Sequence, residues 1–137
     1  MTQSEKLIRT RGIAGVSAEV YTLMGYLQTT DATTTTILTI EVPEKSSAAI
    51  TVRGTGRQND FTDRLIIVEH SGWYRASGGN ITAHGTSDRY QDEDSGGAPT
   101  VTISASAPAN VLVQVAGIAA ETWNWLMSAE VVLLTTP

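Results

Sequence analysis

The chain has 137 residues, of which 41% are hydrophobic and 17% charged, and its formal net charge at neutral pH is −5. This length suits one ordinary domain, and the low charge disfavours helices with charged outer faces. The chain lacks cysteine, which excludes thiol nucleophiles, thiolate metal sites and disulfides. Its nine basic residues are spread thinly, which disfavours nucleic-acid binding.

The first segment differs from the rest of the chain. Residues 1–19 show no sustained alternation and combine Lys6, Arg9 and Arg11 with two glycines. We predict an extended N-terminal arm here, with a disordered terminus as the alternative. A separate domain is predicted over residues 20–137.

From residue 20 onward, short segments alternate apolar and polar residues between turn signals, which is typical of strands. The clearest turn is at residues 77–80, where glycine and asparagine tolerate a positive φ. No helix is predicted, and no segment resembles a membrane span. About eight strands predict an all-β fold, an antiparallel two-sheet sandwich that is jelly-roll-like. The strands are predicted over residues 20–28, 34–42, 48–56, 65–76, 81–86, 100–106, 111–115 and 122–134.

An acidic segment over residues 88–99 has no apolar alternation and is predicted to be a long exposed loop. Its carboxylates make Asp88, Asp92 and Asp94 candidate calcium ligands. The segment lacks the full calcium-loop pattern, so a solvated acidic loop is the alternative and no metal site is assigned.

The two histidines, His70 and His84, fall on strands that the turn at residues 77–80 would pair, so they are expected to face each other. Two ligands without a third indicate a metal weakly, and surface histidines are the alternative.

Catalytic patterns are absent from the sequence. Ser71 and Ser95 each precede glycine without forming a nucleophile elbow, and no helix follows Gly54 and Gly56 to bind a phosphate. The polar positions of three alternating strands are expected to face solvent: Glu41, Glu69 and Glu130. We therefore predict that the chain is not an enzyme and uses no cofactor.

The aromatic residues divide into two groups. Trp123 and Trp125 share one face of a predicted strand with apolar neighbours, which indicates the core or a subunit interface. Trp73 and Tyr74 lie at the end of a strand beside a turn, so they are the candidates for contact with a glycan.

Several runs resemble a group of small all-β structural proteins of tailed bacteriophages. The runs LQTTDAT at residues 27–33, TILTI at 36–40, NVLVQVAG at 110–117 and TWNW at 122–125 carry this resemblance. It covers about residues 20–134 and is poorest over 64–99. It implies a virion component assembled in the host cytoplasm, acting as a homo-oligomer with a trimer favoured, and it transfers no catalytic residue.

The resemblance implies two functions. The first is a capsid-decorating (cement) protein that contacts the major capsid protein or other virion proteins through its arm, with Lys6, Arg9 and Arg11 as partner-binding residues. The alternative is a host-recognition module of a tail fibre or spike that binds glycan through Trp73, Tyr74 and the loop at residues 88–99. Neither function involves nucleic acid or a membrane.

Overall fold

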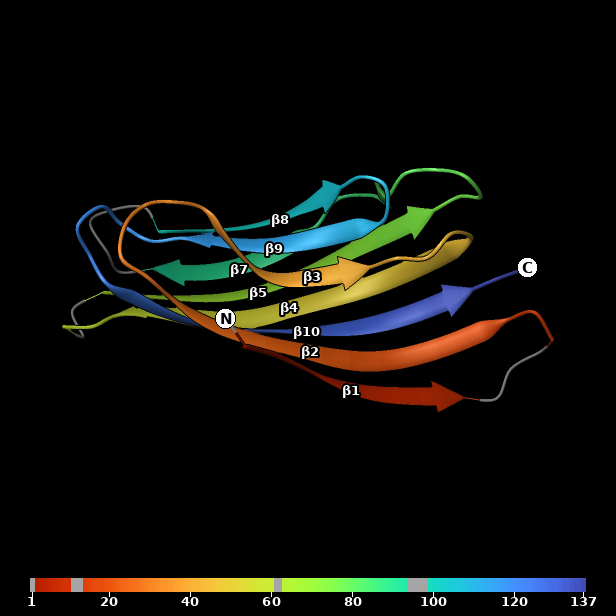
Figure 1. Cartoon of the computed structure of the whole chain (residues 1–137), viewed down its shortest axis with the longest axis horizontal. Coiled ribbons are helices and arrows are strands. Elements are labelled where there is room, and N and C mark those ends of the chain that lie inside the picture. Colours follow the sequence, from red (N-terminus) through yellow and green to blue (C-terminus); the bar gives the residue numbers. More distant parts are fainter. Residues whose placement is uncertain (1, 11–13, 61–62, 94–98) are drawn as a thin grey trace.

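The structure is a computed structural model that describes residues 2–10, 14–60, 63–93 and 99–137, with only the backbone path described for residues 2–10. The described residues form ten strands and no helix, and hence no helix that could cross a membrane. The strands build two antiparallel sheets, so the prediction of an all-β two-sheet sandwich is confirmed (Figure 1).

The larger sheet has seven strands in the order β1-β2-β10-β4-β5-β6, with β7 also paired to β5, and the smaller has the order β3-β9-β8. Figure 1 shows β1 and β2 along the lower edge of the view, with β10 and β4 next to them. The strand bounds are β1 (Thr2–Thr10), β2 (Ser17–Thr29), β3 (Thr35–Glu41), β4 (Ser46–Gln58), β5 (Arg64–Arg75), β6 (Thr82–Ala83), β7 (Asp88–Glu93), β8 (Thr100–Ser106), β9 (Asn110–Ala116) and β10 (Trp123–Thr135).

Two segments pair in the large sheet, one inside the predicted arm and one inside the predicted acidic loop. Thr2–Thr10, inside the predicted arm, pairs along its length with β2 as an edge strand of the large sheet. The predicted loop at residues 88–99 is wrong over its first half, because Asp88–Glu93 forms β7 against β5. This edge strand is exposed on almost every residue, so its sequence shows no apolar alternation although its backbone is paired.

The core lies between the sheets, and β10 is its central strand in the larger one. Trp123 and Trp125 are 0% and 2% exposed, which confirms the interpretation of these residues as core. Their rings stack with centroids 5.5 Å apart. The Trp125 indole N–H donates to the hydroxyl of buried Thr29 at 3.0 Å, so this polar group is satisfied inside the core.

Two glycines of β4 make room for β10. Gly56 and Gly54 lie opposite Trp125 and Met127 in the ladder. A Cβ atom at Gly56 would lie 2.5 Å from the Trp125 ring, and one at Gly54 would lie 2.0 Å from the Met127 sulfur. The Gly-Thr-Gly run therefore serves packing, because larger residues would collide with the core.

Glu69 corrects a further expectation. Predicted to face solvent, it is 4% exposed and points between the sheets. Its carboxylate pairs with the guanidinium of Arg89 from β7, and Arg89 also donates to the Val101 carbonyl of β8 at 2.9 Å. The charge is tolerated inside because β7 supplies its partner, and Arg89 thereby links the two sheets.

Candidate functional site

Exposed apolar side chains gather on one surface of the molecule. In the described ranges, every large hydrophobic residue classed as exposed projects from the large sheet, on the side away from the small sheet. We call this surface the large-sheet outer face. Its exposed apolar members are Met24, Tyr26, Ile66, Tyr74, Tyr90, Leu126, Val132 and Leu134.

The strand register divides this face into two apolar ends. At the Tyr26 end, Leu126 lies opposite Tyr26 on β2 and opposite Thr55 on β4. At the Tyr74 end, Leu134 lies opposite Ser47, which in turn lies opposite Tyr74. A polar band separates the two ends and consists of Glu130, Thr51, His70 and Asp88, which are neighbours in successive strands.

The Tyr74 end contains a groove of about 640 Å³. Small residues on β4 and β5 line its floor, namely Ser47, Ala49 and Gly72. The side chains flanking this floor are large: Val132 and Leu134 on β10, and Tyr74 and His84 on the other side. The groove follows from the sequence, because small residues at these positions of β4 and β5 leave a depression between larger side chains.

The aromatic wall is held in place by backbone contacts. The His84 N–H donates to the Gly72 carbonyl at 2.9 Å, which fixes the segment after β6 against β5. A Cβ atom at Gly72 would lie 3.3 Å from the His84 carbonyl oxygen, so glycine permits this close approach. The Tyr74 and His84 rings then meet edge to face, with centroids 5.9 Å apart at 84°.

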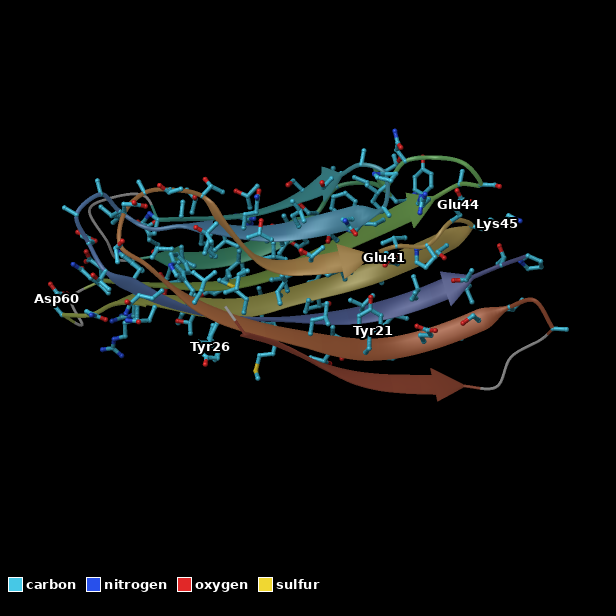
Figure 2. The ribbon with its side chains drawn as sticks, in the orientation of Figure 1. Tyr21, Tyr26, Glu41, Glu44, Lys45 and Asp60 are labelled. Atoms are coloured by element: carbon cyan, nitrogen blue, oxygen red, sulfur yellow. The ribbon has the colours of Figure 1, made fainter. Side chains whose placement is uncertain are left out.

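The opposite wall is anchored at the β3–β4 turn. Thr136 donates its N–H to the Lys45 carbonyl at 3.0 Å, and the Ser46 and Thr135 hydroxyls lie 2.7 Å apart. These bonds tie the end of β10 to the start of β4, beside Leu134 and Ser47. Figure 2 labels Glu44 and Lys45 at this turn.

The groove combines apolar surface with a few polar groups. Its described lining includes one hydroxyl on Ser47, the phenol of Tyr74 and the imidazole of His84, with no Asp, Glu, Lys or Arg. Aromatic rings pack against the C–H faces of a sugar ring, and hydroxyl and imidazole groups can bond its hydroxyls. The arrangement therefore suits an uncharged, hydroxyl-bearing ligand.

The two aromatic candidates are separated by the strand geometry. Tyr74 is 39% exposed and stands on the groove wall. Trp73, its neighbour in sequence, is 7% exposed on the opposite side of the strand, and its indole N–H donates to the Ser71 hydroxyl at 2.9 Å. Trp73 therefore contributes to the core, and the exposed aromatic group at this position is Tyr74.

The histidines have different partners. His70 Nδ1 lies 3.0 Å from the Thr51 hydroxyl in the polar band, whereas His84 contacts Tyr74. In the register, β6 pairs with Trp73 and Tyr74, so His70 lies further along β5, where β7 replaces β6. The expectation that the two histidines face each other is wrong, because the register places His84 beside Gly72, two residues along β5 from His70.

The remaining candidates are described only in part. Asp88 and Asp92 are exposed on β7, and Asp94 lies outside the described residues. Within the described ranges, no group of three residues could hold a metal ion. The Lys6 and Arg9 backbones lie opposite Thr22 and Glu19, their side chains are outside the description, and Arg11 is outside the described residues.

Sequence reasoning missed Leu126, Val132 and Leu134. All three occupy outward positions of β10, where the alternation assigns polar residues. An apolar residue at such a position departs from the alternation, and this departure could have indicated exposed apolar surface on β10. Val132 and Leu134 form one wall of the groove, so that wall was not predicted.

Comparison with known proteins yields fold similarity only. No family model matches the chain, and no curated protein does. Similar solved structures include the tailspike gp49 of Acinetobacter baumannii bacteriophage Fri1, described as a capsular polysaccharide depolymerase, with 13% identity and a TM-score of 0.43 over 90% of this chain and 19% of that one. The tailspike of A. baumannii phage AM24 shows 10% identity and a TM-score of 0.37 over 93% of this chain and 25% of that one.

The chain thus spans about a fifth to a quarter of either tailspike. Both are described as bacteriophage tailspike proteins, and bacteriophage structural proteins are also the class that the sequence resembles. The prediction that the chain is not an enzyme is contradicted, because a capsular polysaccharide depolymerase is an enzyme. That prediction is withdrawn. The similarity is too low to assign the activity of either protein to this chain.

Proposed function

We propose that the chain is a tail-associated module of a bacteriophage virion that takes part in host recognition by binding a cell-surface glycan. The observation that carries the proposal is the groove at the Tyr74 end, where an exposed aromatic wall stands beside a floor of small residues. The virion and tail assignments draw support from the sequence resemblance.

The chemistry of the groove favours a sugar over other small ligands. The floor of Ser47, Ala49 and Gly72 carries only small side chains, and the Tyr74 ring offers apolar surface together with a polar hydroxyl. The lining carries no Lys or Arg to hold a phosphate or sulfate. An uncharged part of a saccharide therefore fits best.

A groove this open gives modest affinity at a single site. Carbohydrate recognition by a virion gains strength when many copies bind one surface, because linked sites raise the effective concentration of the next contact. Weak binding by one module is therefore compatible with firm attachment of a particle.

The test is a glycan array followed by titration of the glycans that bind. The variant Tyr74→Ala removes the aromatic wall, and Tyr90→Ala removes another exposed tyrosine of the same face, on β7. We expect Tyr90→Ala to bind as the unmodified chain does, and Tyr74→Ala to lose about tenfold or more in affinity.

Two outcomes would overturn the proposal. One is an equal loss of glycan affinity in both tyrosine variants, which would mean that the glycan does not bind specifically in the groove. The other is absence of glycan binding in a chain that decorates purified capsids, which would restore the cement function.

A further inference from the structure

We propose that a small pocket at the edge of the sandwich binds the acetamido group of an N-acetylated sugar. The pocket has a volume of about 190 Å³ and adjoins the groove, because Gly72, Trp73 and His84 line both cavities. We call it the edge pocket. The inference rests on the proposed function, since the sugar that carries the acetamido group lies in the groove. The other residues of its lining are Glu69, Ser71, Ala83, Gly85, Ser87 and Ile103.

The edge pocket lies where the strands beside β5 are interrupted. β6 pairs with β5 at residues 73–74, and β7 pairs with it at residues 65–70. Residues 71–72 lie between the two ladders and, among the described strands, pair with neither β6 nor β7. The segment that links these strands contains Gly85, whose φ of 74° permits a turn there. The edge of the large sheet is therefore open at this position.

The β5 wall of the edge pocket offers a hydrogen-bond acceptor and a donor. Glu69, Ser71 and Trp73 are alternate residues of β5, so they lie on one side of the strand. One oxygen of Glu69 bonds Arg89, and a carboxylate can accept further bonds. The Ser71 hydroxyl accepts from the Trp73 indole, so its own hydrogen remains to donate. This wall can therefore bond a ligand N–H and a ligand carbonyl at the same time.

The small sheet supplies apolar surface to the same pocket. Ile103 of β8 lines the pocket and packs against the core. An acetamido group combines an N–H donor, a carbonyl acceptor and a methyl group, so it matches all three surfaces. A hydroxyl group would leave the apolar surface of Ile103 without a partner, and a carboxylate would meet the negative charge of Glu69.

The size of the pocket suits a substituent. Its volume is that of roughly six water molecules in the liquid, which is too small for a whole saccharide chain. The groove and the pocket meet at His84, whose ring contacts Tyr74 on the groove side. A sugar ring packed on Tyr74 therefore lies beside His84, and a substituent that passes His84 enters the edge pocket.

The test is a nuclear magnetic resonance titration of the full labelled chain with N-acetylglucosamine, N-acetylgalactosamine, glucose and galactose. Each acetamido sugar differs from its hydroxyl counterpart in one substituent. One additional buried hydrogen bond predicts that an acetamido sugar binds about fivefold more tightly than its counterpart. Only the acetamido sugars should shift the amide signals of Gly85 and Ser87.

A variant that fills the edge pocket separates it from the groove. Ala83→Leu places a larger side chain in the pocket and should abolish the preference for acetamido sugars, while all four sugars still bind in the groove. Ala119→Leu is the matched control, because Ala119 is also an exposed alanine and lines neither cavity. This control should keep the preference. If Ala83→Leu fails to fold, Ser87→Leu fills the pocket from the linking segment and provides the same test.

The outcomes distinguish the edge pocket from the proposed function. Sugar binding that depends on Tyr74 but shows no preference for the acetamido group overturns the edge pocket alone. A preference that persists when the pocket is filled also overturns it, because the acetamido group must then bind elsewhere. Absence of binding by all four sugars and by every glycan of the array overturns the proposed function and the edge pocket together.

Discussion

The two outer faces of this sandwich are built on a common core but differ in what they present to their surroundings. The small-sheet outer face carries mainly hydroxyl and amide groups, in rows such as Thr102, Gln114 and Thr36, beside the half-buried Leu112. The Gln114 amide donates to the Thr36 hydroxyl at 3.2 Å. The large-sheet outer face instead carries tyrosine, leucine, isoleucine, methionine and valine.

This difference shows which apolar residues the fold requires for its core and which it does not require. Both sheets bury their inner faces, so stability alone does not require apolar residues outside. The small-sheet face shows that this fold can be completed with a polar surface. The apolar groups of the large-sheet face therefore indicate surface for binding other molecules.

The largest expected effect compares neighbouring residues on β10 that point to opposite faces. Trp125→Ala removes a side chain that is 2% exposed, and we expect it to lower the free energy of unfolding by about 3 to 5 kcal/mol. Leu126→Ala, at 46% exposure, should change it by less than about 0.5 kcal/mol. Urea unfolding of both variants measures the difference, and similar losses would mean that the outward position is not free surface.

The next effect compares two glutamates. Glu69→Ala leaves Arg89 without its carboxylate partner, and because Arg89 is partly exposed we expect a loss of about 2 to 3 kcal/mol. Glu130→Ala, in the polar band of the outer face, should cost less than about 0.5 kcal/mol. Chemical unfolding tests this pair, and equal values would contradict the inward placement of Glu69.

A smaller effect is expected at two threonines. Thr29→Val removes the acceptor of the Trp125 indole N–H inside the core, which should cost about 1 to 2 kcal/mol. Thr39→Val makes the same change on the exposed side of β3 in the small sheet and should be nearly neutral. Thermal unfolding followed by circular dichroism measures both; a neutral Thr29→Val would show that another group accepts from Trp125.

The smallest effect on stability is expected for two lysine substitutions, one on each outer face, which should differ in their effect on glycan binding. Thr102→Lys on the small-sheet face and Val132→Lys on the large-sheet face should each change the free energy of unfolding by less than about 0.5 kcal/mol, because both positions are exposed. Only Val132→Lys should weaken glycan binding, since Val132 lines the groove. Loss of binding in Thr102→Lys would place recognition on the other face.

Much of the fold could be predicted from local sequence. The β8–β9 hairpin and the inward residues of β10 follow from period-two alternation, which reflects burial of one side. The failures have a common physical origin. β7 is an exposed edge strand without alternation, and the burial of Glu69 depends on Arg89, twenty residues away, so neither shows in a local pattern.

The candidate site was predictable only in part. The turn at residues 77–80 indicated Trp73 and Tyr74 together, but adjacent residues of a strand point to opposite faces, so the two do not share one surface. The groove itself needs Val132 from β10, Ala49 from β4 and His84 after β6 to come together. Such long-range neighbours depend on strand order, which the sequence does not state.

The central claim is that the large-sheet outer face binds and the small-sheet outer face does not. The most direct measurement is a nuclear magnetic resonance titration of the labelled chain with a glycan selected from the array. We expect chemical-shift changes at the amides of Ser47, Gly72, Tyr74 and His84, with none at Thr102 and Gln114. Changes centred on the small-sheet positions would contradict the claim.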